Sequence, residues 1–213
     1  MTMPATQTAP VVPMKKSDRT REEILRSAAR LFRDRGYHAS TLREIAQEAQ
    51  IKAGSIYYHF GSKDEIIDEV LDLGLRQIFL AVQAVMAAER DNPDHRARIG
   101  RAIREHLNLL VEHGEFTSAN IRIYGQLPED VRARHRPLRR QYAQLWEDLL
   151  TEARDAGAIR SDIDIVPLRQ FLLGALNWTV ELFRPDRASL DLHADRCLAL
   201  VLDGISTGTR NGL

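Results

Sequence analysis

Three observations predict an all-α fold for this chain of 213 residues. Apolar side chains recur three and four residues apart along most of its length, which is the spacing of one face of an α-helix. No segment alternates apolar and polar residues as a half-buried strand would. The composition, 44% hydrophobic and 6% aromatic with few Pro or Gly inside the periodic segments, fits a globular helical protein. We therefore predict about nine helices, a short N-terminal unit followed by a larger helical domain.

The N-terminal part predicts three helices joined by tight turns. Residues 18–35 carry one apolar stripe at helical spacing, and Gly36 ends this helix as a left-handed cap would. A second helix starts at Thr41, because Glu44 three residues later completes a capping box. After a short connection, a third helix spans 54–60. A helix, a tight turn and a second helix form the arrangement that places the second helix in the DNA major groove.

The stretch from Thr41 to Lys63 resembles the DNA-binding domain of TetR family transcriptional regulators. Residues 56–60, Ile-Tyr-Tyr-His-Phe, followed by Lys63, match that family's most specific local signature. The resemblance implies an all-helical dimer with this N-terminal domain and a larger C-terminal domain for ligand binding and dimerisation. Two positions depart from the family pattern: Gln50 stands where the turn commonly has Gly, and Lys52 where a small hydroxyl residue is common. A left-handed conformation at Gln50 would cost about 1 kcal/mol.

We predict three parts along the chain. These are a disordered arm with a basic end at 1–16, the helix-turn-helix domain at 17–62, and the ligand-binding and dimerisation domain at 63–213. The formal net charge is zero, but residues 1–65 hold 11 Lys+Arg against 8 Asp+Glu while residues 66–213 hold 19 against 22. The positive sign of the N-terminal part fits a surface that faces DNA.

Eight residues of the predicted helix-turn-helix are candidates for DNA contact. They are Thr41, Lys52, Gly54, Ser55, Tyr57, Tyr58, His59 and Lys63. The two tyrosines and the histidine point away from the apolar stripe, where they can reach phosphates and base edges. Lys63 and the amides near Ser62 can hold a phosphate at a helix start, and Gly54 permits close approach to the groove. The alternative is that the aromatic triplet simply packs as part of an amphipathic helix.

The remainder of the chain predicts six further helices, at about 63–88, 94–113, 116–124, 129–154, 164–183 and 189–205. The first of these is ~39 Å long at 1.5 Å per residue, long enough to join DNA to a distant pocket. Pro137 predicts a kink or a new helix start. Apolar residues on more than one side of the last two helices predict a symmetric four-helix dimer interface. The residues expected there are Leu172, Leu176, Leu198, Leu202 and Ile205.

Six amphipathic or aromatic residues are candidates for ligand contact, although each could instead belong to the core or to an interface. They are Phe79, Asn120, Tyr124, Trp146, Asn177 and Trp178. Residues 174–178 with 183–185 resemble the penultimate helix of TetR-type regulators of fatty-acid, aromatic-acid or steroid catabolism that respond to acyl-CoA thioesters. Arginines between Arg132 and Arg140 could receive the phosphates of CoA, or could form a solvated helix face.

No pattern typical of an enzyme or a metal centre is present. The sequence lacks HExxH, a Gly-Lys-Ser/Thr phosphate loop, Gly-x-Ser-x-Gly and any cysteine cluster, so we expect no catalytic residue, metal ligand or cofactor. Cys197 is the single cysteine, which excludes an intrachain disulfide and favours the reducing cytoplasm. No apolar run approaches the roughly 20 residues that span a membrane, so we expect no membrane partner.

The sequence thus predicts a homodimeric regulator that binds a palindromic DNA operator. We expect a repressor released by a small hydrophobic effector, with an acyl-CoA thioester as the specific candidate. Two alternatives remain open: an activator of the same fold, and a helical interaction module or enzyme that does not bind DNA.

Overall fold

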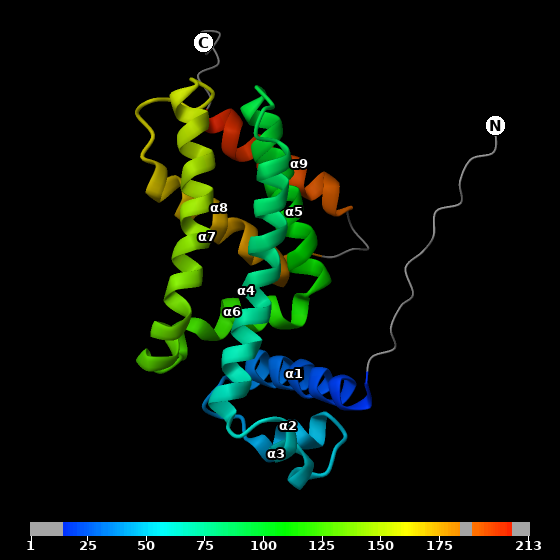
Figure 1. Ribbon diagram of the computed structural model, residues 1–213. Coiled ribbons are helices and arrows are strands. Elements are labelled where there is room, and N and C mark those ends of the chain that lie inside the picture. Colours follow the sequence, from blue (N-terminus) through cyan, green and yellow to red (C-terminus); the bar gives the residue numbers. More distant parts are fainter. Residues whose placement is uncertain (1–14, 184–188, 206–213) are drawn as a thin grey trace, which may run out of the picture.

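The computed structural model describes residues 15–183 and 189–205, and within these ranges the chain forms nine α-helices and no strand (Figure 1). Both the predicted fold class and the predicted number of helices are confirmed for this part of the chain. The helices are α1 Lys16–Arg35, α2 Leu42–Glu48, α3 Ile56–His59, α4 Lys63–Ala88, α5 His95–Glu112, α6 Gly114–Ile123, α7 Glu129–Asp155, α8 Ile165–Leu182 and α9 Leu190–Ile205. Short 3-10 turns, η1 Ala53–Ser55 and η2 Tyr124–Gln126, precede α3 and follow α6. The arm expected at 1–16 lies almost wholly outside the described residues.

Helices α1, α2 and α3 form a small module at the lower end of Figure 1. Its centre is made by Phe32 of α1, Ile45 of α2 and Ile56 of α3, all fully buried. The predicted capping box is present, because the Thr41 hydroxyl accepts from the Glu44 backbone N–H and the Glu44 carboxylate accepts from the Thr41 N–H. Local capping and one apolar face per helix therefore define this module.

The turn after α2 adopts the expected left-handed conformation at Gln50, where φ is 55°. The Ile51 N–H donates to the Ala46 carbonyl at 2.9 Å, and the Gln50 N–H donates to the Gln47 carbonyl at 3.1 Å. This pair of hydrogen bonds is the Schellman motif, which satisfies the last carbonyls of a helix. The motif holds the turn despite the backbone strain of a residue with a side chain.

The core of this module continues into helices that follow it in sequence. The first turns of α4 and the inner face of α6 belong to the same buried cluster as α1, through Ile66, Ile67, Val70, Phe116, Ala119 and Ile123. In Figure 1, α6 runs across the bundle directly beside α1. Gly74 lets α4 approach α6, since a Cβ at this position would lie 2.6 Å from the Phe116 carbonyl oxygen. Helix α6 is thus part of the support of the N-terminal module.

The second core lies among α4, α5, α7, α8 and α9, with Trp146 fully buried inside it. Helix α7 runs unbroken through Pro137, so the predicted alternative of a new helix start there is wrong. Pro137 is itself exposed, whereas Val131 before it and Tyr142 after it are buried. Packing on both sides of the proline offsets the missing hydrogen bond of the helix.

By length and composition, helix α4 is apolar enough to cross a membrane. This finding differs from the expectation that the sequence contains no such apolar run. It is the single helix of this kind in the described part of the chain. It packs against α1, α5, α6 and α7, and its apolar residues contribute to both cores.

The expected dimer-interface leucines are mostly core residues, so that assignment is wrong for them. Leu172 and Leu176 of α8 are fully buried within the protomer, and Leu202 of α9 nearly so. The most exposed large apolar residues of these helices are instead Phe171 at 68%, Trp178 at 58% and Leu200 at 81%. Leu198 is half-buried against the core, and the Ile205 side chain lies outside the described residues. Helix α8 is apolar on two sides, so periodicity alone could not identify its inner face.

Candidate DNA-binding surface and effector cavity

The segment η1–α3 presents a row of exposed side chains at the end of the molecule. Tyr57 is 63% exposed and Tyr58 is 83% exposed, because Ile56 and Phe60 on the opposite side anchor the helix in the core. The ring of Tyr58 lies 5.2 Å from that of His59, edge to face. Four more candidates for DNA contact are exposed on the same module, namely Thr41, Lys52, Gly54 and Ser55. Aromatic, hydroxyl and cationic groups suited to base edges and phosphates are therefore brought together here.

Lys63 has a different environment from the other candidates. Its Nζ donates to the backbone carbonyls of Tyr37 and Ser40, each at 2.9 Å, and lies 4.2 Å from the centre of the Tyr37 ring. The start of α4 is thereby tied to the loop between α1 and α2. Two of the three N–H groups of Lys63 are thus used within the protein, where they position the module.

Arg43 is a candidate that the sequence reasoning missed. It is exposed on α2, next to Thr41, and forms no ion pair with any other described residue. Its neighbour Leu42 packs against the core, whereas Arg43 is exposed to solvent. A guanidinium at this position suits a phosphate oxygen. The apolar periodicity of α2 was the available signal, because it placed Arg43 off the buried stripe.

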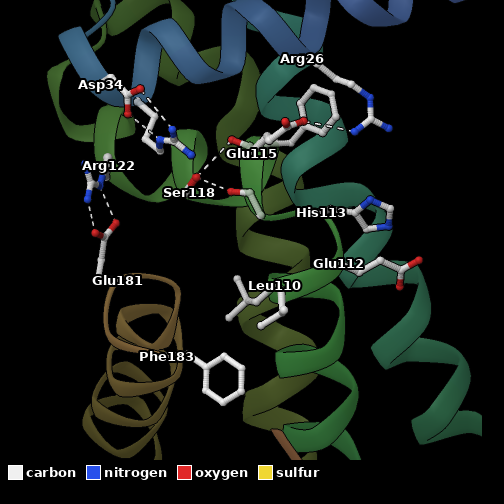
Figure 2. Close-up of a pocket in the computed structure, with 14 residues that line it drawn as sticks. Arg26, Asp34, Leu110, Glu112, His113, Glu115, Ser118, Arg122, Glu181 and Phe183 are labelled. Atoms are coloured by element: carbon white, nitrogen blue, oxygen red, sulfur yellow. Dashed lines mark hydrogen bonds and ion pairs between the residues drawn. The ribbon is translucent and has the colours of Figure 1, made fainter. Parts of the chain in front are cut away.

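A wide cleft of about 730 Å³ lies between α1, the junction of α5 and α6, and the end of α8 (Figure 2). Figure 2 shows ion pairs across it, with Arg26 to Glu115 at 3.2 Å and Arg122 to Glu181. The Arg122 guanidinium holds the pKa of the Glu181 carboxyl below its usual range. The charges of these lining residues are thus used to join α1, α6 and α8. These ion pairs connect the N-terminal module to α6 and α8 across the cleft.

A second, more enclosed cavity of about 340 Å³ lies among α4, α5, α6, α7 and α8. Its apolar wall is formed by Leu75, Ile78, Leu110 and Leu173. Its polar groups include Asn120 of α6 and Asn177 of α8, two of the six predicted ligand residues. Apolar walls with a few convergent polar groups are typical of small-molecule sites.

The other four predicted ligand residues lie behind the cavity or outside it. The Phe79 ring packs edge to face on Tyr142, which lines the cavity, at 6.0 Å. The Tyr124 ring lies under the Arg139 guanidinium, with the Cζ atom 3.5 Å from its centre. Trp146 packs edge to face on His106 and Tyr142, and Trp178 is on the exposed face of α8. Three of the four therefore support residues that form the wall.

His106 is a polar residue of the cavity wall that is not among the predicted ligand residues. It is 1% exposed, and its Nδ1 lies 2.6 Å from the Tyr142 hydroxyl. Burial lowers the pKa of His106 to about 4, while Asn177 acts in the opposite direction. The imidazole is therefore neutral at physiological pH. Its buried Nε2 makes no hydrogen bond of normal length and angle among the described residues, although the Asn177 side chain is close enough to act on the ring.

Arg139 contributes a positive charge to the same cavity. Its Nη2 donates to the Asn120 side-chain oxygen, and the Asn120 Nδ2 donates in turn to the Leu71 carbonyl of α4 at 2.8 Å. Burial lowers the pKa of Arg139, and its Nε is buried without a partner. Arg169, on the opposite wall, instead pairs with Glu147 at 2.8 Å. Three other arginines of the segment, Arg132, Arg134 and Arg136, pair with carboxylates of α4 or α7.

Two family models match the chain over most of its length. Residues 24–70 match the bacterial regulatory proteins of the tetR family, and residues 92–205 match the tetracyclin repressor-like C-terminal domain. The chain belongs to the TetR family. The chain is therefore a ligand-responsive, DNA-binding transcriptional regulator of the repressor type.

Several relatives of this TetR protein match almost end to end. The transcriptional repressor KstR2 of Rhodococcus jostii (strain RHA1) is 31% identical over 88% of this chain and 91% of its own. The structure of the ketosteroid regulator KstR2 of Mycobacterium tuberculosis aligns with a TM-score of 0.77, 26% identity and coverage of 88% and 95%. AibR, solved with isovaleryl coenzyme A and operator DNA, aligns with a TM-score of 0.70, 25% identity and coverage of 86% and 98%.

Among residues 15–183 and 189–205, no cluster of His, Cys, Asp or Glu side chains could hold a metal ion.

Proposed function

We propose that this TetR protein is a homodimeric cytoplasmic repressor that leaves a palindromic operator when an acyl-CoA thioester enters the cavity of about 340 Å³. The observation that carries the proposal is the position of α6. One side of this helix, through Phe116 and Ala119, packs in the core of the N-terminal module. Another side, through Asn120, lines the cavity. The complex of AibR with isovaleryl coenzyme A and operator DNA supports an effector of this class.

The mechanism is a shift of population between two arrangements of the N-terminal modules. An effector favours the arrangement that does not fit DNA only by the difference between its affinities for the two arrangements. A ligand group that displaces Asn120 changes its hydrogen bond to the Leu71 carbonyl, and hence the contact between α6 and α4. Because α4 continues directly from the helix-turn-helix, such a change reaches the recognition helix.

Dimer formation is assigned to the exposed faces of α8 and α9. Phe171 and Trp178 are seven residues apart on α8 and therefore share one face, and Leu200 is a further exposed apolar residue on α9. Large exposed apolar side chains gathered on one face are typical of an interface. A twofold axis through this face would place two α3 helices to read the two halves of a palindrome.

The test is a fluorescence-anisotropy titration of the protein with DNA from upstream of its own gene, followed by titration of the complex with acyl-CoA thioesters. The expected result is saturable binding to that DNA, release by at least one thioester, and no release by free CoA. By reciprocity, saturating DNA must weaken thioester binding by the same factor. Absence of specific DNA binding would overturn the proposal, and release only by a free acid would overturn its thioester part. In vitro transcription distinguishes a repressor from an activator of the same fold.

A further inference from the structure

The polar atoms of the effector cavity are incompletely satisfied. Five buried side-chain nitrogens of the described residues have no hydrogen-bond partner, and two of them, His106 Nε2 and Arg139 Nε, belong to residues that line this one cavity. Buried polar groups of folded proteins are nearly always partnered. Two unpartnered nitrogens in the wall of a cavity therefore indicate a ligand that supplies acceptors.

The charge in the cavity is also uncompensated. Arg169, which also lines this cavity, pairs with Glu147, whereas Arg139 has no carboxylate of the described residues within ion-pair distance. The Asn120 oxygen and the Tyr124 ring hold its guanidinium in place without neutralising it. Removing an unpaired charge from water is expensive, and an anion that binds the guanidinium recovers that cost.

His106 adds a neutral donor. The Tyr142 hydroxyl lies 2.6 Å from Nδ1, and when this hydroxyl donates, the neutral imidazole carries its proton on Nε2. Burial keeps the ring neutral, so it offers this N–H without adding a second charge. A guanidinium and an imidazole N–H in a small, otherwise apolar cavity match the two acceptor oxygens of one carboxylate.

We propose that the end of the effector buried in this cavity carries a carboxylate, which binds Arg139 with His106 as the second donor. The inference deepens the proposed function, on which it rests. It predicts that a thioester ending in a methyl group is a poor ligand, because such a ligand leaves both nitrogens unpartnered. The carboxylate can come from the far end of an acyl-CoA or from a free organic acid that enters the cavity alone.

The experiment compares ligands of equal chain length by isothermal titration calorimetry on the full chain without DNA. The probes are adipoyl-CoA and hexanoyl-CoA, which differ in the terminal carboxylate, together with free adipate and hexanoate. We expect adipoyl-CoA to bind about tenfold or more tightly than hexanoyl-CoA, as suits one charge-assisted hydrogen-bonded contact. Arg139→Met should abolish the preference, and Arg139→Lys should keep part of it. Binding of adipate as tight as that of adipoyl-CoA, again dependent on Arg139, would identify the free acid as the source.

Arg132→Met is the matched control, because the Arg132 guanidinium pairs with Glu129 on the surface of α7 and is not part of the cavity wall. It should leave the preference unchanged. The proposal is overturned if hexanoyl-CoA binds as well as adipoyl-CoA, if Arg139→Met retains the preference, or if none of the four probes binds. Operator affinity is measured separately with the same probes. Arg139-dependent binding of adipoyl-CoA that releases no DNA would overturn the proposed function and leave the carboxylate site standing.

Discussion

Tyr58 projects into solvent from α3, whereas the Lys63 amine is held by the carbonyls of Tyr37 and Ser40. Tyr58→Ala should therefore weaken operator binding by about 1–3 kcal/mol and leave the free energy of unfolding unchanged. Lys63→Ala should lower the free energy of unfolding by about 1–3 kcal/mol, because two buried acceptors lose a charged donor. Anisotropy and urea denaturation of both variants measure these quantities. Equal stability of Lys63→Ala and wild type would show that the amine does not position the module.

His106 makes the stability of the protein depend on pH. Its pKa is lowered by burial from 6.5 to about 4, so the unfolded chain takes up the proton first as the pH falls. The stabilisation is complete above pH 6.5 and is lost progressively towards pH 4. Across this pH window, the free energy of unfolding of wild type should fall by on the order of 3 kcal/mol more than that of His106→Gln. Urea denaturation at a series of pH values checks this, and parallel stability curves for the two proteins would contradict it.

At the scale of single elements, the turn between α2 and α3 stores a correctable strain. Gln50 has a φ of 55°, which glycine adopts without the steric cost of a Cβ. Gln50→Gly should raise the free energy of unfolding by roughly 0.5–1 kcal/mol, after allowance for the greater freedom of glycine in the unfolded chain. Gln47→Gly, inside α2, is the control and should lower it by about 1 kcal/mol. Denaturation of both variants tests the pair, and destabilisation by Gln50→Gly would count against the strain.

The helices themselves were predictable because caps and apolar spacing are local properties. Thr41 with Glu44, and Ser62 with Glu65, mark helix starts that the structure contains. Pro137 was read as a kink or a helix start because its local cost was visible, whereas the packing on either side that offsets it was not. Element boundaries and types therefore follow from the sequence, but the fate of a strained position depends on tertiary contacts.

The site was only partly predictable, for the same reason. The exposed face of α3 follows from one helix, and Tyr57 and Tyr58 were correctly expected to point outward. The effector cavity combines residues of five helices, so the meeting of His106 with Arg139 depends on how those helices cross. Sequence spacing carries no information on such crossings between distant segments.

At the scale of the whole molecule, the exposed face of α8 and α9 predicts the oligomeric state. Phe171→Glu combined with Trp178→Glu should convert a dimer to a monomer, because two charges would enter an apolar interface. The affinity of the double variant for the operator should also fall, since a monomer binds only one half-site. Leu80→Glu, at an exposed leucine of α4, is the matched control and should remain dimeric. Sedimentation velocity at micromolar concentration measures the outcome, and a dimeric double variant would place the interface elsewhere.

The shared core around α6 sets a rule for building hybrid regulators. Phe116, Ala119 and Ile123 pack into the N-terminal module although they lie more than fifty residues beyond its last residue in the sequence. If only residues 1–62 were transferred to another regulator, they would pack against the α6 of that regulator. The mismatch would leave cavities or steric clashes between the module and α6. A new operator specificity is therefore transplanted cleanly by exchanging the exposed side chains of α3 alone, or by moving the module together with the α6 face that completes it.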